Sequence, residues 1–196
     1  MKIISALLSY LIGSIPTGYI IFYLSEKKDI RRFGSQATGT TNVLRLKGWK
    51  YGLVVFAGDF LKGFLPVYAV LKIFNDLSLA VICSFLVVVG HCFPIYIKFK
   101  GGKGVATTIG VFSLLAFKPL LISLFLFLIV TLISRYVSLG SLLAVLNLPL
   151  SAFLFRADYK IIVLGIAVFI VVGFRHKGNI WRLAQGKERK IGERIK

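Results

Sequence analysis

The sequence predicts an all-α integral membrane protein of about seven transmembrane helices, and three observations support this fold class. Hydrophobic residues make up 57% of the 196 residues, and the mean hydropathy is +0.85, whereas an ordinary soluble domain is roughly half apolar. The apolar residues form runs that approach the length of a spanning helix, and the basic residues gather in alternate loops between those runs. A water-soluble fold could not bury this much apolar surface.

Seven apolar segments define the expected helices, because a helix needs about 20 mostly apolar residues to cross the ~30 Å hydrocarbon core. These segments are Ile3–Leu24, Gly52–Phe74, Ser78–Phe99, Val105–Phe117, Pro119–Ser134, Val137–Phe155 and Ile161–Phe174. The fourth is short for a full crossing, which favours a broken or tilted helix. The first is too long for the apolar core of a signal peptide and is expected to remain as a helix. We expect residues 1–196 to form a single transmembrane domain.

The basic residues predict the orientation, because cytoplasmic loops carry the excess of Lys and Arg. Most of the 25 basic residues follow the first, third, fifth and seventh segments. They are Lys27, Lys28, Arg31, Arg32, Arg45, Lys47, Lys50, Lys98, Lys100, Lys103 and Arg135, with Arg175, Lys177, Arg182, Lys187, Arg189, Lys190, Arg194 and Lys196 in the tail. The amino terminus is therefore expected outside and the carboxy terminus in the cytoplasm.

The net charge of +18 indicates membrane lipid as a partner, because each basic residue near an anionic surface contributes about 1 kcal/mol of attraction. Nucleic acid is not an expected partner, since the charge lies in short loops rather than on one soluble domain with interleaved aromatic residues. Cys83 and Cys92 share one apolar segment and suggest neither a disulfide nor a metal site. No metal and no cofactor are expected.

The first cytoplasmic loop reads GSQATGTTNVLR from Gly34 to Arg45. Small residues such as Gly39 let backbone N–H groups turn toward an anion, and a helix start adds the positive end of its dipole. Thr40, Thr41 or Asn42 could cap a helix through residues 43–46, and Arg45 would offer a planar fork to phosphate. The alternative is a flexible loop with a lipid-facing arginine.

The second cytoplasmic loop reads GHCFPIYIKFKGGKGVATT from Gly90 to Thr108. Gly101, Gly102 and Gly104 surround Lys103, and such glycines indicate a positive φ or a close backbone approach. This pattern favours a phosphate cradle at the start of the next helix. It is not a Walker A loop, whose spacing of glycine, lysine and hydroxyl residues is absent. His91, at the end of the third segment, is expected to be a packing residue.

The third polar segment reads RHKGNIWRLAQGKE from Arg175 to Glu188. His176 and Asn179 are three residues apart, so on a helix they would share a face and point toward one ligand. The alternative is an interfacial helix anchored by Trp181. Ser141, at the cytoplasmic start of the sixth segment, could add a hydroxyl to a ligand site or serve only in helix packing.

Two charged residues lie inside the second apolar segment, Asp59 and Lys62. Charges at that depth usually face a bundle interior or a cavity. The two side chains are expected to pair with each other.

These polar segments, with GSIPTG at Gly13–Gly18 and DFLKG at Asp59–Gly63, resemble the bacterial acyl-phosphate-dependent glycerol-3-phosphate acyltransferases, the PlsY family. The resemblance covers nearly the whole chain, and the motifs fall in the family's order and spacing. One departure follows the Gly-Ser pair, where the family usually has Gly-Asn-x-Gly-Ala-Thr-Asn and this chain reads QATGTTN.

The resemblance implies transfer of a fatty acyl group from acyl phosphate to the 1-hydroxyl of sn-glycerol 3-phosphate, giving lysophosphatidic acid and inorganic phosphate, the first acylation of phospholipid synthesis. It implies a multi-pass protein of the bacterial inner membrane with its active site on the cytoplasmic face. By position it assigns catalysis to Ser35, Arg45, Lys103, His176 and Asn179. It assigns a structural role to Glu188. The residues expected to bind substrate or phosphate are Gly39, Thr40, Thr41, Asn42, Gly101, Gly102, Gly104 and Ser141.

The residues agree with this reading, because both substrates carry phosphate and acyl phosphate is already activated. A covalent acyl-enzyme is therefore not required, and either His176 or a substrate phosphate oxygen could take the hydroxyl proton. The His-x4-Asp motif of acyl-CoA-dependent acyltransferases is absent, since Tyr96 stands five residues after His91 and Trp181 five after His176.

Two other classes remain open from the residues alone. A transporter or channel for phosphate-bearing anions would also use cationic, glycine-rich loops, but its site should lie near the membrane midplane between broken helices. A purely structural membrane anchor would leave the glycine pattern unexplained. The clustering of the candidate residues in loops on one face favours interfacial chemistry.

Overall fold

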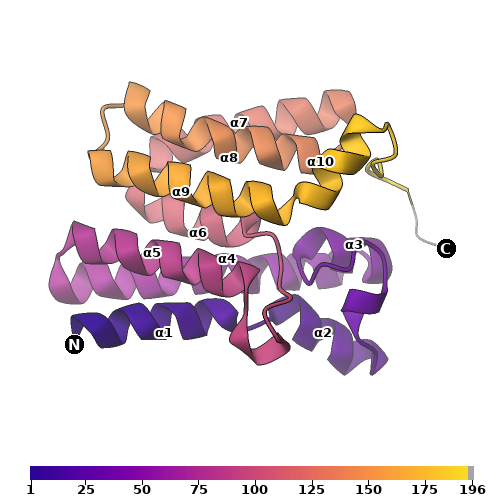
Figure 1. Cartoon of the computed structure of the whole chain (residues 1–196), viewed down its shortest axis with the longest axis horizontal. Coiled ribbons are helices and arrows are strands. Elements are labelled where there is room, and N and C mark those ends of the chain that lie inside the picture. The colour runs from indigo at the N-terminus through magenta and orange to yellow at the C-terminus, as the bar shows by residue number, and fades with distance from the viewer. Residues whose placement is uncertain (194–196) are drawn as a thin grey trace. The chain divides into compact units, whose positions relative to one another are not determined.

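The computed structural model describes residues 1–193, and this part of the chain contains helices, turns and loops but no strand. The basic residues Arg194 and Lys196, which were expected on the cytoplasmic face, lie outside the described residues. The α-helices are α1 (Lys2–Ser14), α2 (Thr17–Glu26), α3 (Thr40–Lys47), α4 (Trp49–Phe74), α5 (Leu77–Cys92), α6 (Val105–Leu115), α7 (Phe117–Ser134), α8 (Val137–Leu154), α9 (Tyr159–Arg175) and α10 (Lys177–Ala184) (Figure 1). Two short 3₁₀ helices, η1 (Ile30–Arg32) and η2 (Ile95–Ile97), lie in the loops.

Five helical stretches are long and apolar enough to cross a membrane: Lys2–Glu26, Trp49–Phe74, Leu77–Ile97, Phe117–Ser134 and Val137–Leu154. The bent pair α9 and α10 would make a sixth if it counted as one span, and α6 is a shorter apolar helix. These stretches account for the seven predicted segments, although the number of crossings stays a prediction. Side chains on their flanks, such as Leu132 and Ile133, are strongly exposed, as expected for a surface that faces lipid.

Two of the predicted helices differ from the structure, and in both cases a proline explains the difference. The first segment is broken between α1 and α2, where Ile15 has an extended ψ of 113° and Pro16 has no N–H to continue the hydrogen-bond ladder. The third segment was predicted to run to Phe99, but α5 ends at Cys92 and Pro94 begins a turn. Proline ends this helix instead of kinking it.

The described residues form two compact units, Met1–Val111 and Phe112–Glu193, and α6 runs across the division between them. The expectation of a single transmembrane domain stays a prediction.

In the first unit, α1 packs along α5 (Figure 1). A side chain at Gly13 would overlap the carbonyl of Val87, and one at Gly90 would overlap the carbonyl of Tyr10. Small residues at such crossings let two membrane helices approach until their backbones touch. The Tyr10 hydroxyl donates to the carbonyl oxygen of Phe93 at 2.9 Å, which ties α1 to the end of α5.

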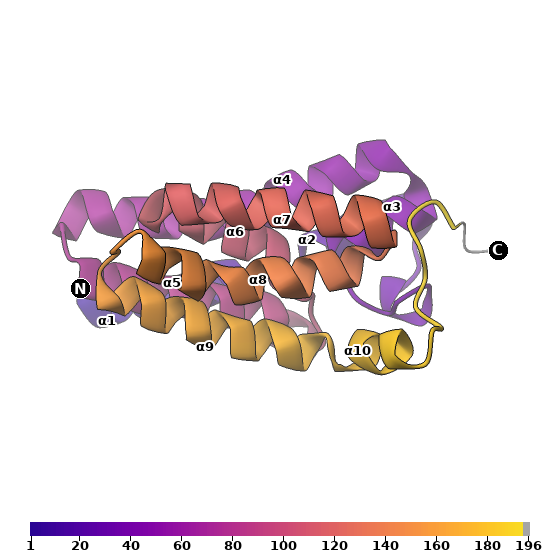
Figure 2. The same ribbon diagram turned by 90° about the horizontal axis from the view of Figure 1, so that it is seen from above.

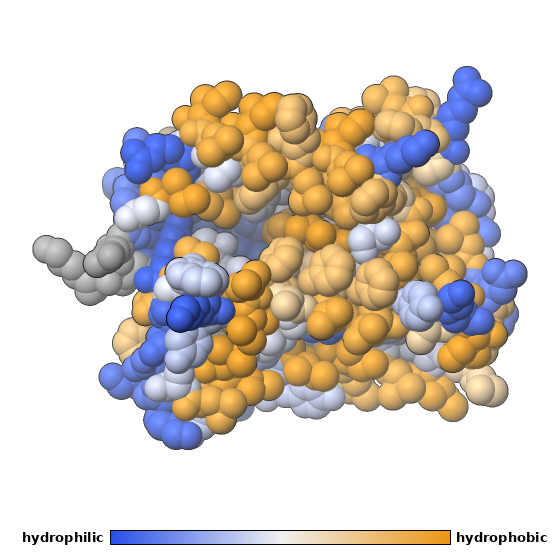
Figure 3. Space-filling model, turned by 180° about the vertical axis from the view of Figure 1, so that it is seen from behind, coloured by the Kyte–Doolittle hydropathy of each residue, from blue (hydrophilic) through white to orange (hydrophobic). Residues whose placement is uncertain are grey.

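In the second unit, α7, α8 and α9 lie side by side (Figure 2). The hydroxyl of Thr131 occupies the space where Gly140 lacks a side chain. The amide of Asn147 donates to Ser151 at 2.7 Å and to Ser123 at 3.1 Å, so its polar group is satisfied between α7 and α8. Apolar side chains cover the helix flanks on the face drawn in Figure 3, while hydrophilic side chains gather toward the helix ends.

Candidate active site

The loop before α3 is fastened by the side chain of Asn42, which is only 2% exposed. Its Oδ1 accepts the backbone N–H of Ser35 at 2.9 Å, and its Nδ2 donates to the carbonyls of Ala37 at 2.9 Å and Phe33 at 3.2 Å. Both ends of the amide are therefore directed at the loop's own backbone. Asn42 therefore shapes the loop that presents Ser35, while its predicted role in binding phosphate stays a prediction.

The other candidates of the first loop lie at the start and end of α3. The helix begins at Thr40 with Gly39 as its N-cap, and no side chain caps it. The expectation that Thr40, Thr41 or Asn42 would cap a helix over residues 43–46 is therefore wrong. Because glycine has no side chain, Gly39 cannot cap the first backbone N–H groups of the helix. Arg45 is half-buried and belongs to the last turn of α3.

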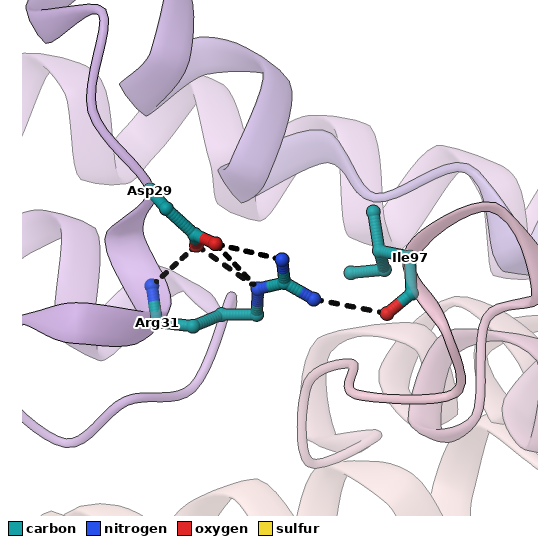
Figure 4. Close-up of polar contacts among 3 residues, drawn as sticks. All are labelled: Asp29, Arg31 and Ile97. Carbon is teal, nitrogen blue, oxygen red and sulfur yellow. Dashed lines mark hydrogen bonds and ion pairs between the residues drawn. The ribbon is translucent and has the colours of Figure 1, made fainter.

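A salt bridge between Asp29 and Arg31, which the sequence analysis did not identify, lies in the loop between α2 and α3, and a further hydrogen bond from Arg31 reaches Ile97 in the loop between α5 and α6 (Figure 4). The guanidinium of Arg31 holds Asp29 through Nε at 2.9 Å and Nη2 at 2.7 Å, while its Nη1 donates to the carbonyl of Ile97 at 2.9 Å. The hydrogen bonds from Arg31 lower the pKa of Asp29, against the opposing effect of burial. An aspartate two residues before an arginine, DIR, was the available sequence signal.

The segment Gly101–Gly104, here called the glycine loop, approaches other backbone closely, as its composition predicts. A side chain at Gly101 would overlap the carbonyl of His91 and the ring of Pro94, and one at Gly102 would overlap the imidazole of His91. Gly104 has φ +88° and leads into α6. These contacts explain the glycines by packing and turn geometry, while their predicted role in binding phosphate stays a prediction.

Lys103 is half-buried between these glycines.

The predicted pairing of Asp59 with Lys62 is confirmed, since their charged atoms are 2.8 Å apart. His91 is buried, as expected for a packing residue.

In the second unit, His176 stands at the bend between α9 and α10, which turn by 65°. Its Nδ1 lies 2.8 Å from the carbonyl oxygen of Val172. Because a carbonyl can only accept, Nδ1 carries the proton in this contact. His176 is 2% exposed and Asn179 is 5% exposed. Both side chains are thus buried in the fold, while their predicted role in binding one ligand stays a prediction.

Glu188 joins three donors at the end of the second unit. Its Oε1 accepts from Asn179 Nδ2 at 2.6 Å and from the Ser138 hydroxyl at 2.9 Å, and its Oε2 accepts from Arg182 Nε at 2.8 Å. Burial raises the pKa of Glu188, but the hydrogen bonds from these three residues outweigh it, so the pKa lies below its ordinary value. The carboxylate therefore ties α8, α10 and the tail together in its charged form.

The two serines at the start of α8 differ in what they contact. Ser141, a candidate ligand-binding residue, donates its hydroxyl proton to the carbonyl of Val137 within the same helix at 2.8 Å. Ser138, one turn earlier, reaches Glu188 and was missed by the sequence analysis. Its only signal was a position three residues before Ser141 on the same helix face.

A sequence profile of the glycerol-3-phosphate acyltransferase family matches residues 3–186. The chain belongs to this family. The resemblance drawn from the three polar segments is thereby confirmed.

Relatives within the glycerol-3-phosphate acyltransferase family match over nearly their full length. The enzyme of Endomicrobium trichonymphae is 42% identical, covering 97% of this chain and 96% of the relative. That of Carboxydothermus hydrogenoformans is 43% identical, covering 99% and 98%. Both are named glycerol-3-phosphate acyltransferase.

Two solved structures of PlsY, described as an integral membrane glycerol 3-phosphate acyltransferase, share the fold of this family member. The glycerol 3-phosphate form is 37% identical with a TM-score of 0.93 and covers 97% of this chain and 96% of that one. The lysophosphatidic acid form is 36% identical with a TM-score of 0.90 and covers 97% and 95%. The predicted multi-pass helical membrane protein is therefore confirmed, with five to six candidate spans.

Proposed function

We propose that this acyltransferase moves a fatty acyl group from acyl phosphate to the 1-hydroxyl of sn-glycerol 3-phosphate. The products are 1-acyl-sn-glycerol 3-phosphate (lysophosphatidic acid) and inorganic phosphate, in the first acylation of phospholipid synthesis. The observation that carries the proposal is the family match over residues 3–186. It is supported by solved relatives described as glycerol 3-phosphate and lysophosphatidic acid forms.

The proposed reaction needs no covalent enzyme intermediate. The hydroxyl oxygen attacks the acyl carbonyl carbon, the bond between that carbon and the phosphate oxygen breaks, and the phosphate leaves with the bonding electrons. The hydroxyl proton passes to a phosphate oxygen of a substrate or to a protein base. Positioning of the two phosphates and stabilisation of the carbonyl oxygen would supply most of the rate.

In the first unit, we assign phosphate recognition to Arg45, Lys103 and the backbone N–H groups of the glycine loop. Arginine offers a planar fork and lysine a compact charge to phosphate oxygens. Ser35, Thr40 and Thr41 are assigned hydrogen bonds to substrate. Asn42 is assigned to the shape of this loop, because its amide is directed at the loop backbone.

In the second unit, His176 is the protein group suited to take the proton. Its Nδ1 faces the Val172 carbonyl, so Nε2 is the ring nitrogen that would accept a proton in the neutral form. Asn179 and Ser141 are assigned to substrate contacts, and Glu188 to structure. We favour proton transfer to a substrate phosphate, which predicts that His176→Gln keeps part of the activity.

We propose that the chain spans the bacterial inner membrane seven times, with the amino terminus outside and the carboxy terminus and reactive loops in the cytoplasm. The basic loops support this orientation. Cytoplasmic loops would meet glycerol 3-phosphate from the aqueous side, and the acyl chain would arrive from the bilayer.

The test uses purified full-length protein in detergent or lipid with palmitoyl phosphate and sn-glycerol 3-phosphate. Release of inorganic phosphate and formation of lysophosphatidic acid are both followed, and palmitoyl-CoA is supplied as the parallel donor. We expect product from the acyl phosphate only. Lys103→Ala and Arg45→Ala should each lower kcat/KM by at least about a hundredfold, since a lost charged hydrogen bond in the transition state costs about 2.7 kcal/mol or more.

The matched controls are Lys100→Ala, in the same loop and exposed, and Arg32→Ala, exposed near the first loop. Both should keep wild-type kinetics. Well-folded protein that forms no lysophosphatidic acid with either donor would contradict the proposed function and favour anion transport. Product from palmitoyl-CoA alone would contradict the proposed donor.

A further inference from the structure

Three side chains that carry or can carry charge are buried inside the first unit, among its apolar helices. They are Asp59 and Lys62 of α4 and His91 of α5, with exposed fractions of 1%, 7% and 5%. The proposed reaction uses none of them. Because ionisable groups among membrane helices are expensive to bury, their presence indicates a specific task.

Asp59 and Lys62 are held at the break in the first helical stretch. Lys62 Nζ is 2.8 Å from Asp59 Oδ1 and donates to the carbonyl oxygen of Ile15, also at 2.8 Å. The Ile15 carbonyl is turned out of a regular helical ladder where α1 stops before Pro16. The ion pair therefore fixes the position of the Asp59 carboxylate through both α4 and the end of α1.

His91 lies between this carboxylate and the glycine loop. Its Nδ1 faces Asp59 Oδ1 at 3.5 Å. On the opposite side of the ring, Nε2 and Cε1 fill the space that a side chain at Gly102 would need. The imidazole thus separates the fixed Asp59 carboxylate from the backbone of Gly102.

The main chain of His91 also holds the glycine loop. Its carbonyl oxygen accepts the N–H of Gly102 at 3.1 Å, and Gly101 packs against the same carbonyl and Pro94. Lys103 follows directly, and Gly104 with its φ of +88° starts the turn into α6. Contacts with His91 therefore help to set the backbone that carries Lys103.

We propose that His91, oriented by Asp59, is a positioning residue that fixes the glycine loop in the conformation that presents Lys103 and the neighbouring backbone N–H groups to a substrate phosphate. The inference rests on the proposed function for the identity of that phosphate. The contacts among Asp59, His91 and Gly102 do not depend on it. His91 acts through the loop and does not itself touch substrate.

The first test is amide hydrogen exchange, measured by mass spectrometry on the full chain in detergent, for peptides that cover the glycine loop. His91→Ala and Asp59→Asn should each speed exchange in these peptides by at least fivefold, and peptides from the second unit should be unchanged. His91→Asn serves as a second variant if His91→Ala does not fold. The matched control is Ser84→Ala, buried two turns earlier on α5, which should exchange as the wild type does.

The second test separates positioning from bulk stability. In the acyl phosphate assay, His91→Asn should raise the KM for glycerol 3-phosphate about tenfold, change kcat less, and keep the thermal midpoint within a few degrees of wild type. A residue needed only for stability would lower the midpoint and the active fraction while leaving KM unchanged. Unchanged KM and unchanged loop exchange would each overturn the inference.

A double substitution that enlarges Gly102 and shrinks His91 tests independently whether these two residues act through their contact. Gly102→Ala places a methyl group where the imidazole lies, so it should disturb the loop strongly in the wild-type background. In the His91→Ala background the space is available, and the double variant should exchange no faster than His91→Ala alone. Additive effects would show that the two residues do not act through contact.

If the wild type forms no lysophosphatidic acid, the proposed function fails, but the exchange measurements still decide the positioning role.

Discussion

The carboxylate of Glu188 accepts a hydrogen bond from the side-chain amide of Asn179 at 2.6 Å, across the turn that ends α10. Ser138 and Arg182 donate to the same carboxylate. One acidic residue thus fixes the candidate catalytic residue Asn179 and the short helix α10 within the second unit.

Glu188→Ala should lower the stability of the folded protein. It leaves Asn179 and Ser138 without their shared acceptor, and a hydrogen bond to a charged group contributes about 1.5–3 kcal/mol. We expect a drop of several degrees in the midpoint of thermal unfolding in detergent. Glu193→Ala is the control, because that carboxylate is exposed. Equal effects of the two substitutions would contradict the structural role of Glu188.

The pH dependence of this contribution follows from the lowered pKa of Glu188. A carboxyl whose pKa is lower in the folded than in the unfolded protein stabilises the fold above the ordinary value of 4.5. That stabilisation is lost as the pH falls through the folded-state pKa. The difference in thermal midpoint between wild type and Glu188→Gln should therefore be constant near neutral pH and shrink below about pH 4.5. A difference that grows on acidification would contradict the assignment.

Lysine should not be able to replace Arg31, because the guanidinium of Arg31 donates to two partners at once. Arg31 reaches Asp29 with two nitrogens and the Ile97 carbonyl with a third, whereas a lysine ammonium is a single point donor. Arg31→Lys and Arg31→Ala should both speed hydrogen exchange in the turn that includes η2, to a similar extent. Arg32→Ala, a neighbouring exposed arginine, should leave that turn unchanged. Full protection in Arg31→Lys would show that charge alone is enough.

Two of the loop glycines should differ in their tolerance of alanine. A methyl group at Gly101 would meet the His91 carbonyl and the Pro94 ring, whereas Gly39 has open space around it and a φ of −86°. Gly101→Ala should lower the thermal midpoint or the folded yield, and Gly39→Ala should change neither. Size-exclusion profiles and thermal unfolding of the two variants provide the measurement. A stable Gly101→Ala protein would mean that the loop can move away from α5.

The positions of the helices followed from composition, but their ends did not. Seven apolar segments correspond to helices in the structure, because desolvation of the backbone in lipid requires internal hydrogen bonds. The break at Ile15 and the end of α5 at Cys92 were missed, since a proline in an apolar run can kink, break or end a helix. Local sequence does not decide among these outcomes, because packing against neighbouring helices does.

The polar segments were identified by composition, whereas the partner of each side chain was not. Asn42 has the character of a phosphate ligand in the sequence, yet its amide closes the loop around Ser35. Glu188 and Ser138 are 50 residues apart, a separation that no periodicity connects. Hydrogen bonds between distant residues depend on how the helices pack.

By itself, the sequence determined an apolar helical chain, the basic loops and the family to which the chain belongs, because hydropathy and short motifs are local properties. Only the tertiary structure decided that His91 separates Asp59 from Gly102 and that Glu188 joins Ser138, Asn179 and Arg182. The physical reason is that a buried polar group must find its partners wherever the packed chain brings them.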